Sequence, residues 1–588
     1  MIIWKFVLLQ RRQINVKPLR ESFLLGKSFW QLVPVFIVAL LPGPVAGSEM
    51  VGRGTAGMVV TAQREASKAG LDILKAGGNA IDAAVAVGYA LAVVDPCCGN
   101  IGGGGFMLIH RAGGDDVFVN FRETAPVAAT PDMYLDPAGN PIREDSLYGY
   151  RAVAVPGTVR GLDLALSHYG RLKREQVMAS AIALARDGFI LGEPDAAIFA
   201  RDAKRLAVDP EAARIFLHPD GTPYKAGERL RQPDLGATLG KIAAQGPDGF
   251  YDGPIAAALA AASLAHNGLI SEADLAGFTA MELAPLTCVY RGYRIVSSPP
   301  PSSGGTTLCE ILDVLSGWDI GGAGFQSPRA VHLTVEAMRR AFFDRNSVLG
   351  DPDFVANPIA HLLSADYGAT IRAGIDPDKA SASAALGSVP AAAEKPQTTH
   401  YSVVDGDGNA VSVTYTLNGN FGASVVAPGT GFLLNNEMDD FAVKPGAANM
   451  FGLVQGDANA IAPRKRPLSS MAPTIVEKDG QPVFVLGSPG GPRIITAVLE
   501  TLMNLVDFGM APEQAVTAPR FHHQYLPDTV FYEKDGLPSE TLNTLTAMGY
   551  SLKEQAAWGA VELIAIGQDG NLIGVSDPRR PAGAALGY

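Results

Sequence analysis

The hydrophobic positions along the first part of the chain predict two helices followed by a β-hairpin. Between residues 61 and 94, alanine, leucine and isoleucine recur every three or four residues, and Gly77-Gly78 interrupts the run. The short apolar runs 106–110 and 117–121 flank a glycine turn at 113–114. Runs of this length on either side of a turn are typical of paired strands.

The remaining pattern alternates between helical and strand-like segments. Residues 150–290 are alanine-rich and mostly helical in spacing, and 328–343 and 494–508 read as further helices. Residues 561–573 resemble two strands around a turn at 568–571. No internal repeat is visible. Because both halves of the chain mix helices and strands, the pattern favours a layered α/β or α+β fold.

A change of character at residues 373–397 separates the two halves. This stretch is rich in alanine, proline and serine without a strong period, which indicates a linker or flexible loop. A strand-like segment, 399–404, follows at once, and 410–417 returns after a turn at 405–409. The sequence therefore predicts a hairpin that begins where the linker ends.

The hairpin places two threonines opposite each other. If its turn is centred on Asp407, residues equally distant from Asp407 face one another, so Thr398 lies opposite Thr416. A turn centre half a residue away would make the partner Tyr415 or Leu417 instead. Threonine is common in strands, so Thr416 is also compatible with an ordinary structural role.

Thr398 has a chemical use if the chain is cut just before it. Cleavage of the Gln397–Thr398 bond would give Thr398 a free α-amino group, whose ordinary pKa of about 7.7–8.0 suits a general base. The hydroxyl and the amine of one residue would then form a nucleophile–base pair, with Thr416 orienting a proton.

Composition narrows the class of protein. Of the 588 residues 47% are hydrophobic and 18% charged, enough apolar side chain for a large core. The net charge of −12, without a basic stripe, argues against nucleic acid as a partner. No CxxC spacing supports a zinc site, and no metal or other cofactor is expected. Cys97 and Cys98 are adjacent, while Cys288 and Cys309 are compatible with a disulfide or with buried free thiols.

The N-terminus has the order of a secretory signal. Six basic residues precede Phe29, an apolar run of about 13 residues ends at Leu41, and small residues follow near Ala46. The run is shorter than the ~20 residues that span a bilayer. We expect residues 1–47 to be a signal peptide, with an uncleaved signal anchor as the alternative. The mature protein would then be exported, to the periplasm of a Gram-negative cell or otherwise secreted, without a stable membrane span.

Several separate stretches together resemble the γ-glutamyltransferase family. They occur in the family's order from about residue 52 to the C-terminus, which makes chance agreement very unlikely. The matching stretches are GGNAIDAA at 77–84, IGGGGF at 101–106, NFRETAP at 120–126, TTHYSVVD at 398–405, NAVSVTYTLN at 409–418, LNNEMDDF at 434–441, RPLSSMAPT at 466–474 and GSPGG at 487–491.

The resemblance implies a fold and a division of the chain. The family fold is the four-layer αββα sandwich of N-terminal-nucleophile hydrolases, an α+β architecture built from two subunits cut from one precursor. Here the large subunit would comprise residues 48–397 and the small subunit residues 398–588, associated as a heterodimer.

The resemblance also assigns the reacting groups. Thr398 matches the nucleophile for both self-cleavage and catalysis, and Thr416 matches the threonine that assists it. Gly490 and Gly491 match the backbone oxyanion hole, where two N–H groups converge without a Cβ in the way. The cut would fall between Gln397 and Thr398.

Six further matches suit a zwitterionic glutamyl head. A guanidinium forks onto a carboxylate, and an ammonium requires hydrogen-bond acceptors. Without the resemblance, Arg122 would read as a salt-bridged strand residue and the pair Asp439-Asp440 as a cap or solvated loop. The segment 442–452 aligns with the family's lid, where Phe451 stands in place of a frequent tyrosine. The matched ligands are Arg122, Ser469 and Ser470 for the α-carboxylate, and Asn418, Glu437 and Asp440 for the α-amino group.

The function expected from the resemblance is γ-glutamyl transfer. The enzyme would take the γ-glutamyl group of glutathione and other γ-glutamyl compounds onto Thr398 as an ester, then pass it to water or to an amino acid or peptide. The alternatives are a glutaryl- or cephalosporin-acylase on the same fold, and a non-processing homologue with a binding role.

Overall fold

The computed structural model describes residues 49–113, 116–387 and 398–588. The predicted export segment 1–47 and the predicted cleavage residue Gln397 lie outside these ranges. The described residues between 49 and 588 form one compact unit.

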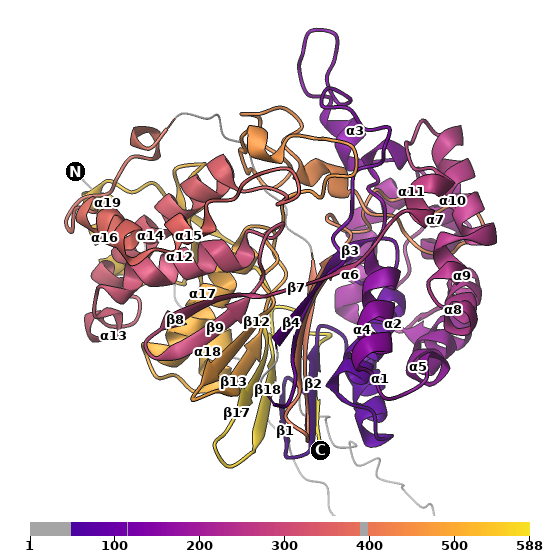
Figure 1. The fold of residues 1–588 in the computed structure, drawn as a ribbon, viewed down its shortest axis with the longest axis horizontal. Coiled ribbons are helices and arrows are strands. Elements are labelled where there is room, and N and C mark those ends of the chain that lie inside the picture. Colours follow the sequence, from indigo (N-terminus) through magenta and orange to yellow (C-terminus); the bar gives the residue numbers. More distant parts are fainter. Residues whose placement is uncertain (1–48, 114–115, 388–397) are drawn as a thin grey trace, which may run out of the picture. The chain divides into compact units, whose positions relative to one another are not determined.

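Two seven-stranded antiparallel sheets stack face to face (Figure 1). The first sheet has the order β19 (Ala584–Gly587), β2 (Gly57–Thr61), β10 (Thr399–Asp405), β11 (Ala410–Thr416), β3 (Gly104–His110), β4 (Asp116–Asn120) and β7 (Met281–Leu283). The second has the order β1 (Val51–Gly54), β18 (Leu572–Ser576), β17 (Glu562–Ile566), β13 (Gln481–Leu486), β12 (Thr474–Lys478), β9 (Tyr293–Ser297) and β8 (Leu286–Tyr290).

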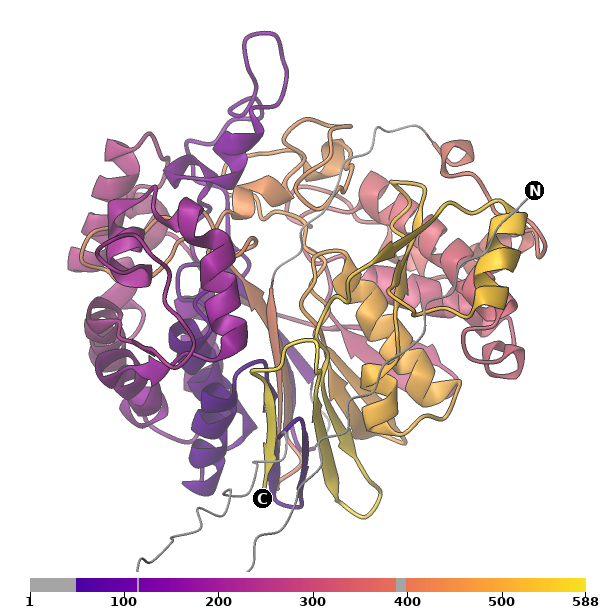
Figure 2. The ribbon, with the colours of Figure 1, turned by 180° about the vertical axis from the view of Figure 1, so that it is seen from behind.

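Helices cover the outer face of each sheet, and the same layers are seen from behind in Figure 2. Against the first sheet pack α1 (Arg64–Lys75), α2 (Ala80–Val94) and α4 (Thr158–Tyr169). Against the second pack α12 (Gly304–Ser316) and α18 (Pro512–Thr517), with α14 (Pro328–Val348) and α17 (Arg493–Val506) against α12. The predicted four-layer αββα sandwich is confirmed.

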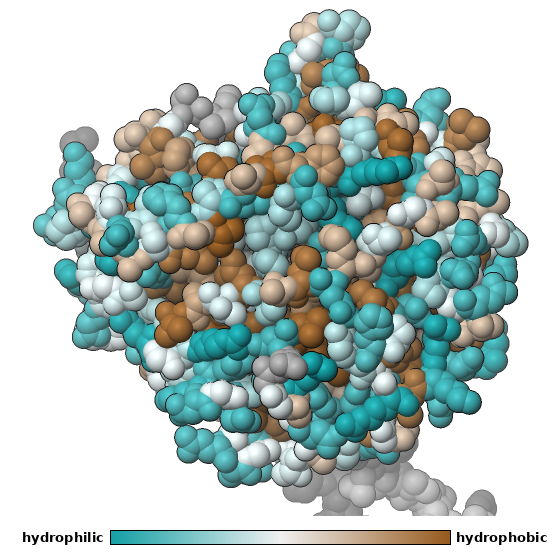
Figure 3. Space-filling model, viewed as in Figure 1, coloured by the Kyte–Doolittle hydropathy of each residue, from teal (hydrophilic) through white to brown (hydrophobic). Residues whose placement is uncertain are grey.

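The helix-rich stretch predicted at 150–290 supplies the outer helices of the first layer. Its described members after α4 are α5 (Arg174–Asp187), α6 (Glu193–Leu206), α7 (Pro210–Phe216), α8 (Pro233–Gln245), α9 (Asp248–Tyr251), α10 (Gly253–Ala265) and α11 (Glu272–Ala276). Among all the described residues, no helix is both long and apolar enough to cross a membrane. On the face drawn in Figure 3, hydrophobic residues form small patches among hydrophilic ones.

Strand periodicity divides the core between the layers. Side chains on a strand point alternately to its two faces. On β3, Met107 and Ile109 join the cluster formed with the helices of the first layer, whereas Phe106 and Leu108 join the cluster between the sheets. Both faces are buried, which explains why these strands read as continuous apolar runs.

The hairpin register agrees with the sequence prediction. Thr399 pairs with Tyr415 and Val404 with Ala410, so the pairing is centred on Asp407. Extended by one residue, this register sets Thr398 opposite Thr416. The hairpin β10–β11 occupies the middle of the first sheet, where neighbouring strands on both sides fix its position.

The sequence left open whether Cys288 and Cys309 form a disulfide or remain buried free thiols. Their sulfurs are bonded, which joins β8 to α12. The described part of the predicted linker, residues 373–387, contains one short turn of 3₁₀ helix, Ser383–Ala385.

Candidate active site

The predicted site residues meet in one cavity at the end of the hairpin. Gly490 immediately precedes a lining residue, and Gln397 lies outside the described residues. Arg345 belongs to this cavity although the sequence did not single it out. The lining residues are Arg122, Arg345, Thr398, Thr416, Asn418, Glu437, Asp440, Phe451, Leu453, Ser469, Ser470, Met471, Gly491 and Ile494.

Thr398 is held at the buried end of β10, with only 4% of its surface exposed. Its carbonyl oxygen accepts a hydrogen bond from Arg580 Nη2 at 2.9 Å. The opposed Thr416 Oγ1 accepts from the backbone N–H of Asn418 at 2.8 Å. Asn418 has a φ of +74°, and its Nδ2 donates to the carbonyl of Asn436 at 2.9 Å. The hairpin end is therefore fixed by hydrogen bonds on both strands.

The two predicted oxyanion glycines lie just before the N-terminus of α17. Gly490 has a φ of +138° and Gly491 a φ of +56°, conformations that favour glycine. A Cβ on Gly491 would also come within 2.8 Å of the Phe451 ring. Backbone strain and the lack of space both require glycine at position 491, which lines the cavity.

Arg122 is fully buried and forms ion pairs with Glu437 and Asp440. Its Nε donates to the carbonyl of Pro467 at 3.1 Å. Burial alone would lower the pKa of Arg122, but the charges of Glu437, Asp440 and Glu123 outweigh it and raise that pKa. Arg122 is predicted to bind the α-carboxylate of the substrate. In this structure it contacts Glu437 and Asp440, the two acids predicted to bind the α-ammonium.

The buried carboxyl groups around Arg122 have too little positive charge beside them to balance their ionised forms. Burial raises the pKa of Glu123 to about 7 and that of Glu437 well above its ordinary value, despite the nearby guanidinium of Arg122. Burial raises the pKa of Asp440 as well. An additional cation placed beside these carboxylates would lower all three pKa values.

The serine side of the cavity is organised by Arg345. Its Nη2 donates to Ser470 Oγ at 3.1 Å, and its Nε donates to Ser303 Oγ at 3.1 Å. Burial lowers the pKa of Arg345 to about 10. The backbone N–H of Ser469 donates to the carbonyl of Pro301 at 2.9 Å. The guanidinium of Arg345 therefore lies on the side of the cavity where the α-carboxylate of the substrate is predicted to bind.

Asp439, the neighbour of Asp440, forms hydrogen bonds with Ser146 and Met450. Its two oxygens accept from Ser146 Oγ at 2.8 Å and from the backbone N–H of Met450 at 2.9 Å. These bonds connect Met450, near the end of the predicted lid, through Asp439 to Ser146. Phe451, within the same segment, is 4% exposed and faces the cavity.

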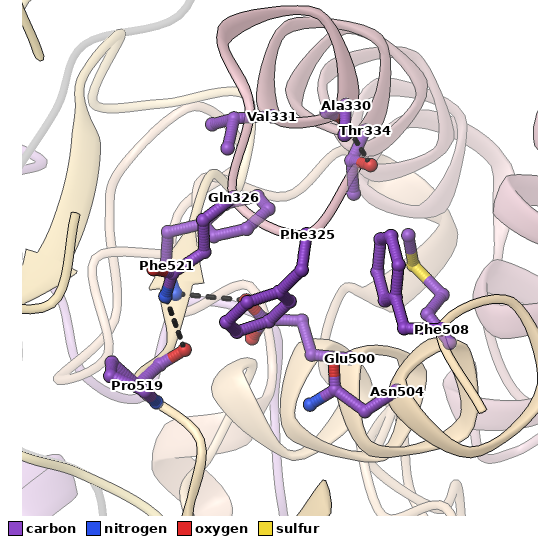
Figure 4. A pocket seen from close by; sticks show the side chains of 11 residues that line it. Phe325, Gln326, Ala330, Val331, Thr334, Glu500, Asn504, Phe508, Pro519 and Phe521 are labelled. Carbon is purple, nitrogen blue, oxygen red and sulfur yellow. Dashed lines mark hydrogen bonds between the residues drawn. The ribbon is translucent and has the colours of Figure 1, made fainter. Parts of the chain in front are cut away.

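A second pocket lies between α14 and α17, formed by other residues (Figure 4). Its walls include the rings of Phe325 and Phe508, and Glu500 accepts there from the backbone N–H of Phe521 at 2.9 Å. None of the predicted site residues lines it. The predicted residues that line a cavity therefore line the one at Thr398 and not this pocket.

Comparison with known proteins adds an independent finding. The family model described as gamma-glutamyltranspeptidase matches residues 66–587. The chain is 52% identical over 541 residues to a glutathione hydrolase proenzyme of Pseudomonas sp. (strain A14), covering 90% of this chain and 94% of that relative. It is 48% identical over 538 residues to the glutathione hydrolase proenzyme of Escherichia coli (strain K12), covering 91% and 92%. The crystal structure of a cephalosporin acylase from Bacillus halodurans has a TM-score of 0.80 and 28% identity, covering 94% of this chain and 99% of that one.

Proposed function

We propose a residue-level mechanism for this chain, which belongs to the gamma-glutamyltranspeptidase family and is a glutathione hydrolase and γ-glutamyltransferase made as a self-processing proenzyme. The proposal is that Thr398 is the nucleophile of both reactions. It rests on one observation, that Thr398, Thr416, Gly491 and the predicted ligands of a glutamyl head line a single cavity.

Maturation would begin at Thr398 in the uncut chain. Its Oγ attacks the carbonyl of Gln397, the C–N bond breaks, and an ester links Gln397 to Thr398. Water then hydrolyses the ester, releasing the carboxylate of Gln397 and the free α-amine of Thr398. The products are a large subunit, 48–397, and a small subunit, 398–588.

Turnover would use the new amine as general base. The amine takes the proton of Thr398 Oγ as the oxygen attacks the γ-carbonyl of the substrate. The N–H groups of Gly490 and Gly491 stabilise the oxyanion, and the leaving amine departs with the proton. Water or the amine of an amino acid or peptide then attacks the γ-glutamyl ester, which restores Thr398.

The glutamyl head would be held by exchange of ion partners. The α-carboxylate would bind Arg122 with the hydroxyls of Ser469 and Ser470, while the α-ammonium would bind Glu437, Asp440 and Asn418. Arg122 contacts Glu437 and Asp440 in this structure. Binding of a zwitterion gives each of these charges a new partner of opposite sign, so no buried charge is left alone.

We also propose that the protein is exported through residues 1–47, with the periplasm as the destination in a Gram-negative cell. The basic, apolar and small-residue order of this segment supports the proposal. Edman sequencing of the large subunit from the periplasmic fraction tests it. A first residue near Ser48 is expected, and an intact Met1 in the cytosolic fraction would refute export.

A second candidate is glutaryl- or cephalosporin-acylase activity. The structural similarity to a cephalosporin acylase favours it. The two candidates differ in whether the substrate carries an α-amino group. The acids Glu437 and Asp440 favour the glutamyl substrate, and cleavage rates of γ-glutamyl and glutaryl p-nitroanilide compared on one preparation distinguish the two.

Intact mass under denaturing conditions is the first experiment. The wild type should give two chains, the smaller comprising residues 398–588, while Thr398→Ala should remain one chain without γ-glutamyl turnover. Thr399→Ala is the matched control, since it removes the neighbouring threonine from the same strand and should still be cut. Turnover by uncut Thr398→Ala, or a cut at another residue, would contradict the assignment.

A further inference from the structure

Arg345 is a buried cation that the mechanism above does not use. It lies in the C-terminal part of α14, lines the same cavity as Thr398 and is 1% exposed. Arg122 and Arg339 are buried to the same degree, and each of them forms ion pairs with carboxylates. In the described part of the chain, no carboxylate forms an ion pair with Arg345. Its charge therefore lacks the partner that the other two have.

Neutral groups take four of the five N–H donors of Arg345. Nε donates to Ser303 Oγ at 3.1 Å and Nη2 to Ser470 Oγ at 3.1 Å. Nη1 donates to Asn346 Oδ1 at 2.9 Å and to Gln455 Oε1 at 3.2 Å. The second hydrogen of Nη2 has no acceptor among the described residues. These bonds hold the guanidinium in place and leave its charge unbalanced.

The electrostatics of the cavity indicate that an anion is missing beside Arg345. Burial lowers the pKa of Arg345 to about 10; the charge of Asp440 opposes this change and the charge of Arg122 adds to it. Arg345 is still protonated at neutral pH. Because a buried guanidinium without an anionic partner is costly, an anion that enters the cavity beside it is stabilised.

The two serines of the cavity can donate hydrogen bonds to such an anion. Ser470 Oγ accepts from Arg345, and Ser469 Oγ accepts from the backbone N–H of Met471 at 3.1 Å. Neither O–H has an acceptor among the residues that the structure describes. A carboxylate only accepts hydrogen bonds, so one of its oxygens can accept from the Ser470 O–H and from the second hydrogen of Arg345 Nη2.

We propose that Arg345 is a second cationic ligand of the substrate α-carboxylate and a determinant of specificity for donors that carry one. The inference rests on the proposed function and deepens it. Arg122 would contact the carboxylate from the side of Glu437 and Asp440, and Arg345 from the side of Ser470. Since Arg122 also interacts with the two acids, Arg345 supplies a positive charge that no group of the described protein neutralises.

A structural role for Arg345 is the alternative that the experiment must separate. Arg345 connects α14 to Ser303, at the start of α12, and to Gln455, so its loss would disturb the cavity if these bonds were its only task. A disturbed cavity slows every substrate, whereas a lost carboxylate ligand affects only substrates that have the carboxylate. Two anilides make the distinction. γ-Glutamyl p-nitroanilide has both the α-carboxylate and the α-ammonium, and 4-aminobutyryl p-nitroanilide keeps the ammonium without the carboxylate.

The experiment compares the mature wild type with Arg345→Gln, which removes the charge. Release of the two chains reports that the variant has folded. We expect KM for γ-glutamyl p-nitroanilide to rise about 10-fold or more, with kcat within about threefold, because a charged hydrogen bond to the carboxylate is lost. The kcat/KM for 4-aminobutyryl p-nitroanilide should stay within about threefold, so the preference for the γ-glutamyl anilide falls. Arg345→Lys keeps the charge without the forked geometry and should have an intermediate preference.

Asn346→Leu is the matched control, because it removes one acceptor of Arg345 outside the cavity lining and leaves the guanidinium in place. Its preference should equal that of the wild type. An unchanged preference in Arg345→Gln, or an equal loss with both anilides, would overturn the inference. If Arg345→Gln does not mature, a wild-type preference in Arg345→Lys would overturn it instead.

Failure of the proposed function is distinguishable from failure of this inference. An enzyme that uses another nucleophile would still turn over after Thr398→Ala. The ratio of kcat/KM for the two anilides in the Arg345 variants does not depend on which residue is the nucleophile.

Discussion

The ion cluster around His110 should make folding stability depend on pH. His110 lies at the end of β3, with Nδ1 2.8 Å from Asp116 Oδ1 and 3.2 Å from Glu477 Oε1, and Arg294 Nη1 lies 2.7 Å from both acids. Burial alone would lower the pKa of His110, but the two carboxylates outweigh it and raise that pKa to about 9. The cluster joins β3 and β4 of the first sheet to β9 and β12 of the second.

The magnitude follows from the difference between the folded and unfolded states. An unfolded histidine has a pKa of about 6.5, so a folded value near 9 corresponds to about 3 kcal/mol of stability. Since the folded pKa is the higher one, the stabilisation is complete below about pH 6.5 and is lost as pH rises to about 9. It should be about 2 kcal/mol at pH 7.5 and under about 0.5 kcal/mol at pH 9.

Urea unfolding of His110→Gln measures this contribution. Both proteins should carry Thr398→Ala, so that an uncut single chain is compared and subunit dissociation does not enter. The difference in unfolding free energy between the His110 parent and His110→Gln should shrink by about 3 kcal/mol between pH 6 and pH 9.5. A difference of the same size at every pH would refute the charged histidine.

Three further predictions concern the cavity. Arg122→Lys keeps a charge but loses the forked geometry, so KM for a γ-glutamyl anilide should rise about 10- to 100-fold, and an unchanged KM would exclude Arg122 as a ligand. Thr416→Val keeps the shape without the hydroxyl, so kcat should fall about 10-fold or more with KM within twofold; wild-type kcat would remove Thr416 from proton orientation. Asp440→Asn should reduce the preference for γ-glutamyl over glutaryl anilide about 10-fold. If the ratio of kcat/KM for the two anilides is unaltered, Asp440 does not bind the substrate ammonium.

The local elements of this fold can be predicted because their patterns are strong. The helices α1 and α2 are separated by Gly77-Gly78, and the centre of the β10–β11 turn is enough to set Thr398 opposite Thr416. The strands β1 and β19 could not be predicted from local sequence patterns. Their sequences, VGRG and AALG, are short and contain glycine without clear alternation, so pairing with distant strands determines them.

Cavity-lining residues that occur in motifs could be singled out from the sequence, whereas an isolated side chain from a distant element could not. Arg345 comes from the C-terminal part of α14, and Arg580 comes from a turn near the C-terminus. An isolated arginine in a helix or a turn looks like any solvated charge. Their buried contacts with Ser470 and Thr398 depend on long-range packing, which no local pattern contains.

The balance of charges in the cavity gives a physical reason for preferring a glutamyl over a glutaryl head. A glutaryl head has one carboxylate to offer Arg122, and accepting it would draw the guanidinium away from Glu437 and Asp440 without bringing a cation to replace it. Two buried carboxylates would then have to take up protons or remain uncompensated, at a cost of several kcal/mol. A glutamyl head brings its own ammonium to the same acids. Because their pKa values are already raised by burial, the ammonium should also favour their ionised forms. Selectivity would thus come from the acids that Arg122 must release, more than from Arg122 itself.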